Sequence, residues 1–418
     1  MADLIRRSRL FTIIKEIRIL WIFIILLSPS FLSTKAFCED LLSNIEISGY
    51  AKSLNTVMQP SPLAGLPSGF ITSNQQRIDL TGEVRDIDFE VSAENNLIFS
   101  EAALSEFDPF THNSVNRIIN LESTIFTDKY SEDKLDIDRL LIRKNFDYGE
   151  LTVGRQAIGY GRMSMVSPLD VIEPFSPDAL DTDTRSGVDA VRATHYFDLG
   201  GQLGGSIVLG DEEENNSYLL NFSHNVNGID ILGICGSLRE RPMLGAGFAT
   251  DIGGMGLKAE AVFYIGKDVN QEGGDIHSSF AIGGIEAWYR FENGINFIVE
   301  YLYNGAGEND PAKYLEVKSS AANNEGLNAF YGQHYLLFGP SYAFTPLVEL
   351  KILSFWNILD GSVFARPLLD ISVTDNTDVQ LFWAMTTGAE PSPATPNIPR
   401  SEFGSIGDYG GVYLKYYF

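Results

Sequence analysis

Cysteine, histidine and positive charge are all scarce in this chain. Its 418 residues include two cysteines, Cys38 and Cys235, and five histidines. Two cysteines cannot build a disulfide framework or a four-cysteine zinc site, and the histidines lack the close spacing of a helical metal pair. Thirty Lys and Arg stand against 55 Asp and Glu, for a formal net charge of −25, which argues against binding to nucleic acid phosphates. We therefore expect no metal, no cofactor and no nucleic acid partner.

Long apolar runs are also lacking, except near the N-terminus. Basic residues at positions 6, 7, 9, 15 and 18 precede the apolar run Ile19–Leu27, and Ser28-Pro29-Ser30 ends it. Thr34 and Ala36 then place small residues at the −3 and −1 positions of a cleavage site. This order is typical of a secretory signal peptide, so we expect residues 1–36 to be removed. The alternative is an uncleaved membrane anchor, which needs about 20 apolar residues to span a bilayer.

The rest of the chain alternates between apolar and polar residues in runs separated by turn residues. In one such run Val379, Leu381, Trp383 and Met385 alternate with Gln380 and its neighbours. Successive side chains of a strand point to opposite faces, so each run predicts a strand with one apolar face. A soluble sandwich would show the same pattern. These runs are longer than the usual strand of about five or six residues, however, and aromatic residues gather near their ends. Short and long connections also alternate, so we predict an all-β transmembrane antiparallel β-barrel.

We expect about 18 strands in the barrel, with 16 as the alternative. Bacterial single-chain barrels normally have an even number of strands and both chain ends in the periplasm. When strands are counted back from Phe418, short and long connections alternate regularly as far as the turn at residues 145–150. When strands are counted forward from a candidate first strand at residues 44–52, the alternation disagrees with the backward count somewhere in residues 100–150. The expected division is a signal peptide (1–36), an N-terminal segment with a possible first strand (37–75) and the transmembrane barrel (76–418).

The C-terminus carries a recognisable pattern. The chain ends Val412-Tyr-Leu414-Lys-Tyr416-Tyr-Phe418, with apolar residues at alternate positions and a terminal phenylalanine. This resembles the C-terminal signature of Gram-negative outer-membrane proteins. The resemblance implies that Leu414, Tyr416 and Phe418 form an assembly signal, that the barrel-assembly machinery is a partner, and that the barrel sits in outer-membrane lipid.

A second resemblance covers about 40 residues in the middle of the chain. It runs from Gly154-Arg155-Gln156 through Gly161-Arg162, Pro168-Leu-Asp170 and Pro174-Phe175 to Gly187-Val-Asp189-Ala-Val-Arg192. This stretch is similar to the GRQ…WG…P-D…PF…GVDALR stretch of porin-like and alginate-export-like barrels. Tyr160 stands where tryptophan is commoner in those barrels.

The long connection at residues 159–185 lies within this stretch. It contains three prolines, five acidic residues and two arginines. A loop longer than about 12–15 residues is usually functional or disordered, and the prolines and matched charges argue against disorder. Our hypothesis is that this loop folds into the barrel and narrows the pore; the alternative is a solvated outer loop. The hypothetical constriction comprises Arg139, Arg143, Arg155, Arg162, Asp170, Glu173, Asp178, Asp181, Asp183, Arg185 and Arg192.

These features favour an outer-membrane channel over two other classes of protein. The inward faces of the predicted strands carry both signs of charge, and about 18 strands leave an aqueous channel. We expect passage of small polar or anionic solutes, such as acidic saccharides. A structural barrel that holds a glycan or partner on its long loops is the alternative. An enzyme is not expected, because adjacent strand residues such as Ser223 and His224 face opposite ways. The sequence leaves the oligomeric state open.

Overall fold

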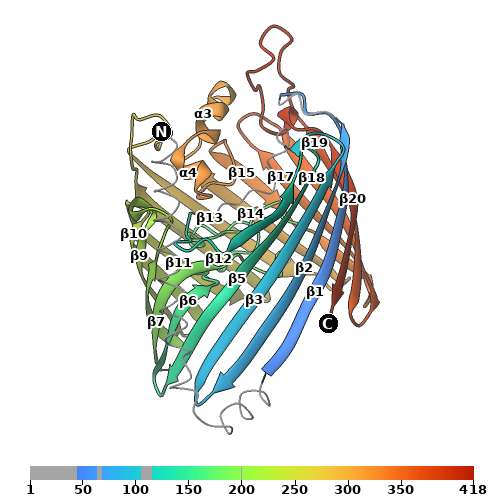
Figure 1. Cartoon of the computed structure of the whole chain (residues 1–418). Coiled ribbons are helices and arrows are strands. Elements are labelled where there is room, and N and C mark those ends of the chain that lie inside the picture. The colour runs from blue at the N-terminus through green and yellow to red at the C-terminus, as the bar shows by residue number, and fades with distance from the viewer. Residues whose placement is uncertain (1–44, 64–67, 105–114, 199) are drawn as a thin grey trace, which may run out of the picture.

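The computed structural model describes residues 45–63, 68–104, 115–198 and 200–418 (Figure 1), so the predicted signal peptide and Cys38 lie outside the described residues. Most of the described chain is strand. The strands are β1 (Ile45–Met58), β2 (Gly69–Val84), β3 (Ile87–Ser100), β4 (Glu122–Thr127), β5 (Ser131–Phe146), β6 (Gly149–Gln156), β7 (Val188–Phe197), β8 (Gly201–Val208), β9 (Ser217–Val226), β10 (Ile229–Leu238), β11 (Arg241–Ile252), β12 (Met255–Ile265), β13 (Ser279–Arg290), β14 (Ile295–Asn304), β15 (His334–Phe338), β16 (Ser341–Thr345), β17 (Val348–Asn357), β18 (Val363–Thr374), β19 (Thr377–Thr387) and β20 (Tyr409–Tyr417). The short helices are η2 (Glu213–Asn215), η3 (Pro311–Lys313), α3 (Tyr314–Lys318), α4 (Ala321–Asn324) and η4 (Phe403–Ser405).

The strands form one closed antiparallel barrel. β1 pairs with both β2 and β20, so the wall has no free edge and begins at Ile45 rather than at residue 76. β15 and β16 share one wall position, because each pairs with β14 and with β17. β4 is an addition: it pairs with the first residues of β5, and β6 pairs with the last. The described residues therefore build 18 wall strands, which confirms the expected number and excludes 16.

Short turns connect the strands at one end of the barrel, and long connections join them at the other. At the turn between β9 and β10, Asn227 and Gly228 have φ values of 54° and 84°, the conformation that a two-residue hairpin turn favours. β1 begins at this end, and Gly49 exchanges two backbone hydrogen bonds (2.9 and 3.0 Å) with Phe418, the last residue. Outer-membrane barrels have short periplasmic turns and long outer loops. We therefore call the two ends periplasmic and outer.

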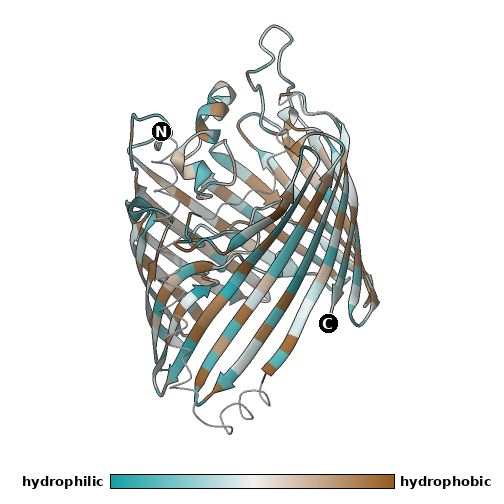
Figure 2. Cartoon of the chain, viewed as in Figure 1, coloured by the Kyte–Doolittle hydropathy of each residue, from teal (hydrophilic) through white to brown (hydrophobic). Residues whose placement is uncertain are grey.

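Hydrophobic and hydrophilic residues alternate along many strands (Figure 2), and many large apolar side chains of the wall are exposed on its outside. On β12, for example, Phe263 and Ile265 are about half exposed, whereas the alternate residues Val262 and Tyr264 are buried inside. A soluble sheet would cover so much apolar surface with a second layer, whereas lipid covers it in a membrane barrel. Within the described ranges, no helix is long and apolar enough to span a membrane.

The interior is only partly polar. A cluster of buried apolar side chains fills much of the outer half, and it joins inward residues of β7–β19 to residues of the connection between β6 and β7. Val262 and Leu302 from the wall belong to it, as do Leu169 and Ile172 from that connection. The prediction of an aqueous channel did not include this packing, because apolar residues also stand at inward positions of these strands.

Candidate functional site

The connection between β6 and β7, residues 157–187, is here called the inner segment. It borders a cavity of about 920 Å³, whose opposite side is formed by inward residues of β16–β20. The charged side chains that line this cavity are balanced in sign: they are Asp170, Asp183, Asp370, Asp378, Arg185, Lys351, Arg366 and Lys415. The cavity therefore lies between this segment and the wall, and both polar and apolar side chains line it.

Three glutamates hold the first half of the inner segment by its backbone. Glu260, Glu286 and Glu300 lie on the neighbouring strands β12, β13 and β14 and are at most 3% exposed. Glu260 accepts hydrogen bonds from the backbone N–H groups of residues 162, 163 and 169, at 2.6, 3.1 and 3.2 Å. Glu286 accepts from the backbone of residue 164, and Glu300 from that of residue 166. Charge-assisted hydrogen bonds are about twice as strong as neutral ones, so this row of carboxylates fixes the path of residues 162–169.

Two aspartates of the inner segment bind the seam where the first and last strands meet. Lys52 of β1 lies directly opposite Lys415 of β20, and both side chains are buried. Asp181 approaches the two ammonium groups at 2.6 and 3.5 Å, and Asp183 approaches them at 2.9 and 3.5 Å. Like charges directly opposite each other destabilise a sheet, so these carboxylates neutralise a repulsion at the seam.

Tyrosines of β20 extend this contact. Tyr413 donates a hydrogen bond to Asp181 at 2.8 Å, and Tyr417 donates one to Asp183 at 2.6 Å. Burial alone would raise the pKa of Asp183, but the hydrogen bonds from Tyr417 and Lys52, with the charge of Lys415, lower it below its usual range. Asp183 therefore stays ionised at any physiological pH.

Arg185 and Asp170 pair within the inner segment and border the cavity. The Arg185 guanidinium lies 2.6 Å from the Asp170 carboxylate, and it also donates to the backbone carbonyl of Glu173 and stacks on Phe175. Burial raises the pKa of Asp170 to about 6, although the charge and hydrogen bond of Arg185 act in the opposite direction. Asp170 is thus the ionisable group of the inner segment whose charge changes under mildly acidic conditions.

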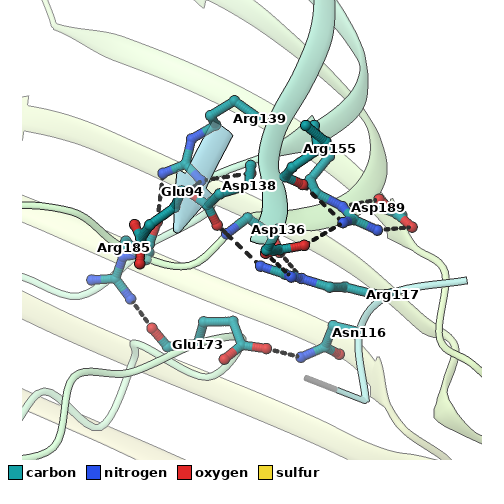
Figure 3. Close-up of polar contacts among 12 residues, drawn as sticks. Glu94, Asn116, Arg117, Asp136, Asp138, Arg139, Arg155, Glu173, Arg185 and Asp189 are labelled. Atoms are coloured by element: carbon teal, nitrogen blue, oxygen red, sulfur yellow. Dashed lines mark hydrogen bonds and ion pairs between the residues drawn. The ribbon is translucent and has the colours of Figure 1, made fainter. Parts of the chain in front are cut away.

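A buried cluster of alternating charges holds the far end of the inner segment (Figure 3). Arg117 binds both Asp136 (2.6 Å) and Asp138 (3.0 Å), and its Nε donates to the backbone carbonyl of Gly187 at 2.7 Å. Asp138 in turn accepts from the Gly187 N–H at 2.8 Å. Arg139 donates to the carbonyl of Arg185. The inner segment is therefore attached to the wall at its start, at the seam and at its end.

Arg155 belongs to the same cluster. It forms a two-pronged contact with Asp189 at 2.8 and 3.1 Å and is almost completely buried. Bidentate pairs of this kind fix geometry as well as charge. The GRQ and GVD parts of the sequence resemblance are thus joined by a direct contact between adjacent strands β6 and β7.

No known family model matches this chain, and no curated protein matches its sequence. Solved structures do match its fold. OccAB4 of Acinetobacter baumannii aligns with a TM-score of 0.57 and 9% identity over 90% of this chain and 98% of its own. OccK2 of Pseudomonas aeruginosa aligns with a TM-score of 0.56 and 9% identity over 90% of this chain and 98% of its own. OpdK of Pseudomonas aeruginosa, which was solved with vanillate, aligns with a TM-score of 0.51 and 10% identity over 89% of this chain and 98% of its own. The chain has a porin fold. The predictions of a porin-like fold and of an outer-membrane location agree with this finding.

Within the porin fold, the residues of the hypothetical constriction fall into separate groups. Asp170, Asp183 and Arg185 line the cavity. Arg139 and Arg155 lie in the buried cluster, and Asp181 lies at the seam. Five others contact their partners elsewhere: Arg192 and Arg143 lie 2.9 and 4.0 Å from Glu150, Arg162 lies 2.8 Å from Asp230, Glu173 accepts from Asn116, and Asp178 accepts from Tyr409.

Sequence reasoning missed the partners of these residues. Arg117 lies in a stretch without strand periodicity, so no pattern marked it. Lys52 and Lys415 alternate with outward residues on their strands. Because successive side chains of a strand point to opposite faces, this alternation could have identified both lysines as inward. Glu260, Glu286 and Glu300 are among the charged residues on the inward faces of the predicted strands, but nothing in the sequence showed that they bind backbone N–H groups.

Proposed function

We propose that this barrel passes small polar solutes across the outer membrane and prefers anions, such as acidic saccharides. One observation carries the proposal: a cavity whose lining includes eight charged side chains, four of each sign, lies inside a wall whose exterior is apolar. Rings of charged side chains set the selectivity of pores, and a lumen of this width holds water. The inner segment then acts as the constriction.

The preference for anions rests on which charges in the cavity already have partners. Asp170 is paired with Arg185, Asp183 with the two seam lysines, and Asp370 with Lys351 at 2.8 Å. Arg366 is bound by the backbone carbonyls of residues 178 and 179 and forms no ion pair with a described carboxylate. Its positive charge is therefore offset by no ion pair of this kind, although the charge of Asp178 also acts on it. Asp378, near the periplasmic end, is the acid that offsets part of this effect.

The fold neighbour OpdK was solved with vanillate, an anion. At 10% identity the similarity shows only that the two barrels share a fold. The solute of this chain therefore has to be inferred from the residues of its own cavity. The cation that such a solute would meet is Arg366, which lies in the wall of the passage opposite the inner segment.

Reversal potentials in a salt gradient test this proposal. The wild-type pore in a planar bilayer should conduct and favour chloride over potassium by a few fold. Arg366→Gln should reduce this ratio toward one, because it removes the positive charge of that residue from the cavity. Arg290→Gln, an equal charge change on an exposed residue outside the cavity lining, is the matched control. A cation-selective wild-type pore that is insensitive to Arg366→Gln would contradict the anion preference.

A surface-binding barrel without transport is the second candidate, because two outer loops pack into the mouth. Phe330 from residues 305–333 makes an edge-to-face contact with Phe355 of the wall, and the ring of Phe403 from residues 388–408 lies tilted against it. Glu402, beside Phe403, accepts hydrogen bonds from the Tyr331 N–H (2.8 Å) and the Asn357 amide (3.0 Å). These contacts give the mouth an ordered surface. Absence of any single-channel conductance from the folded protein would favour this candidate over the channel.

A further inference from the structure

Four carboxamide side chains face outward on three adjacent strands. They are Asn55 on β1, Asn74 and Gln76 on β2, and Asn95 on β3, and we call them the carboxamide patch. In register, Gln76 lies opposite Asn95, and the pairs Asn55–Thr72 and Ser53–Asn74 lie next to them. The patch is therefore continuous across the strands.

The phase of β2 shows that the patch is on the exterior. Ile71, Ser73 and Arg77 alternate with the patch residues and are 2%, 6% and 3% exposed, so they face the interior. Asn74 and Gln76 consequently point away from the lumen. Figure 1 shows β1, β2 and β3 side by side at the front of the barrel, with no other described segment over them.

The patch lies within the apolar exterior of the wall, since apolar residues flank it toward both ends of the barrel. Toward the outer end, Val57, Phe70 and Phe99 are 50%, 39% and 47% exposed. Toward the periplasmic end, Ile47 and Ile78 are 67% and 52% exposed. Elsewhere this exterior is apolar: on β19 the outward residues are Val379, Leu381, Trp383 and Met385.

The hydrogen-bonding capacity of the patch is only partly used within the chain. Asn55 contacts Ser53 (3.2 Å) and Thr72 (3.0 Å), and Asn95 donates to Asp133 at 2.6 Å. Asn74 and Gln76 have no side-chain hydrogen bond to any described residue. A carboxamide offers two donors and two acceptors, and hydrocarbon satisfies neither. A surface of this kind facing acyl chains would be costly, so it needs a polar partner.

We infer that the carboxamide patch is where a second copy of this chain docks. A charged ligand has little to bind here, because Asp133 is the charged side chain beside the patch and Asn95 already uses it. A carboxamide is both donor and acceptor, so a patch of carboxamides is complementary to an identical patch. Symmetric association presents the same surface from each copy. The small side chain of Ala51, opposite Gln76, leaves room for close approach. This inference does not depend on which solute the barrel passes.

Cross-linking in intact outer membranes tests the docking directly. The full chain is expressed with Cys38→Ala and Cys235→Ala, and then with Asn74→Cys or Gln76→Cys. The matched control is Leu220→Cys on β9, which is 60% exposed on another part of the wall. A short bismaleimide should give at least ten times more dimer with the patch cysteines than with Leu220→Cys. Equal yields would overturn the inference, and so would cross-links to a different protein or to lipopolysaccharide.

A second measurement tests whether the carboxamides cause the association. Asn74→Leu combined with Gln76→Leu changes the two residues that have no internal hydrogen bond, so the barrel should still fold and shift in heat-modifiability gels. Native mass spectrometry in a mild detergent should show oligomer for the wild type. It should show at least a tenfold lower oligomer-to-monomer ratio for the double variant at equal concentration. A monomeric wild type, or an oligomer that the double variant leaves unchanged, would overturn the inference.

Discussion

Removing the negative charges at the seam should weaken closure of the barrel. Asp181→Asn with Asp183→Asn would leave Lys52 and Lys415 opposite each other, both buried, without a counter-charge. Breaking a buried ion pair from one side costs roughly 3–5 kcal/mol. Because Asp183 is 42% exposed, water would screen part of this loss, and we expect about 2–3 kcal/mol. The inner segment should also loosen, with a larger and noisier conductance.

Urea unfolding in detergent, followed on heat-modifiability gels, measures the stability change. Glu213→Gln with Glu214→Gln is the matched control, since it removes the same charge from exposed residues of η2 and should change stability by less than about 0.5 kcal/mol. Adding Lys52→Met and Lys415→Met to the aspartate variant should restore stability but not the conductance. A loss below about 1 kcal/mol, or a four-residue variant no more stable than the aspartate variant, would refute the repulsion at the seam.

Three further outcomes are expected. Lowering the pH through about 6 should increase the preference for anions, because protonation of Asp170 leaves Arg185 without its counter-charge. The Asp170→Asn variant should show this increased anion preference at every pH. A wild-type reversal potential that does not change between pH 7.5 and 5 would contradict the prediction. Glu260→Ala should raise conductance and current noise, since residues 162–169 lose three backbone hydrogen bonds, whereas an unchanged single-channel trace would show that the other anchors suffice. Deleting Phe418 should lower the assembled, heat-modifiable fraction several-fold without affecting secretion, and full assembly of the deletion variant would argue against the terminal signal.

The wall could be predicted because the rule that builds it is local. In a membrane barrel each strand needs one lipid-facing side, and alternation along about ten residues shows this without knowledge of the neighbours. The conflict in strand number between residues 100 and 150 has a structural cause. β6 pairs with β5 at residues 140–146 only, and β4 pairs with the outer part of β5 beyond it. The extra short strand at residues 122–127 therefore shifted the forward count by one.

The contacts of the site could not be predicted, because they join residues distant in the chain. Lys52 and Asp181 are 129 positions apart, and Tyr413 lies 232 positions after Asp181. Composition correctly pointed to residues 159–185 as rich in paired charges, but opposite charges there had several possible partners each. The apolar packing of the interior was hidden for a related reason. Glu260 marks the inward side of β12, but Val262 and Tyr264 on that same side are apolar, and alternation could not show that they pack against a loop.

The seam contacts also make the final position of the inner segment depend on closure of the barrel. The inner segment is held by glutamates of β12, β13 and β14 and by Lys415 of β20, the last strand. It cannot reach its final place until the last strand has arrived. We therefore expect the contacts of Asp181 and Asp183 with Lys415 to form only when the wall closes. Access of a soluble thiol reagent to single cysteines in residues 178–183 would then record how far closure has advanced.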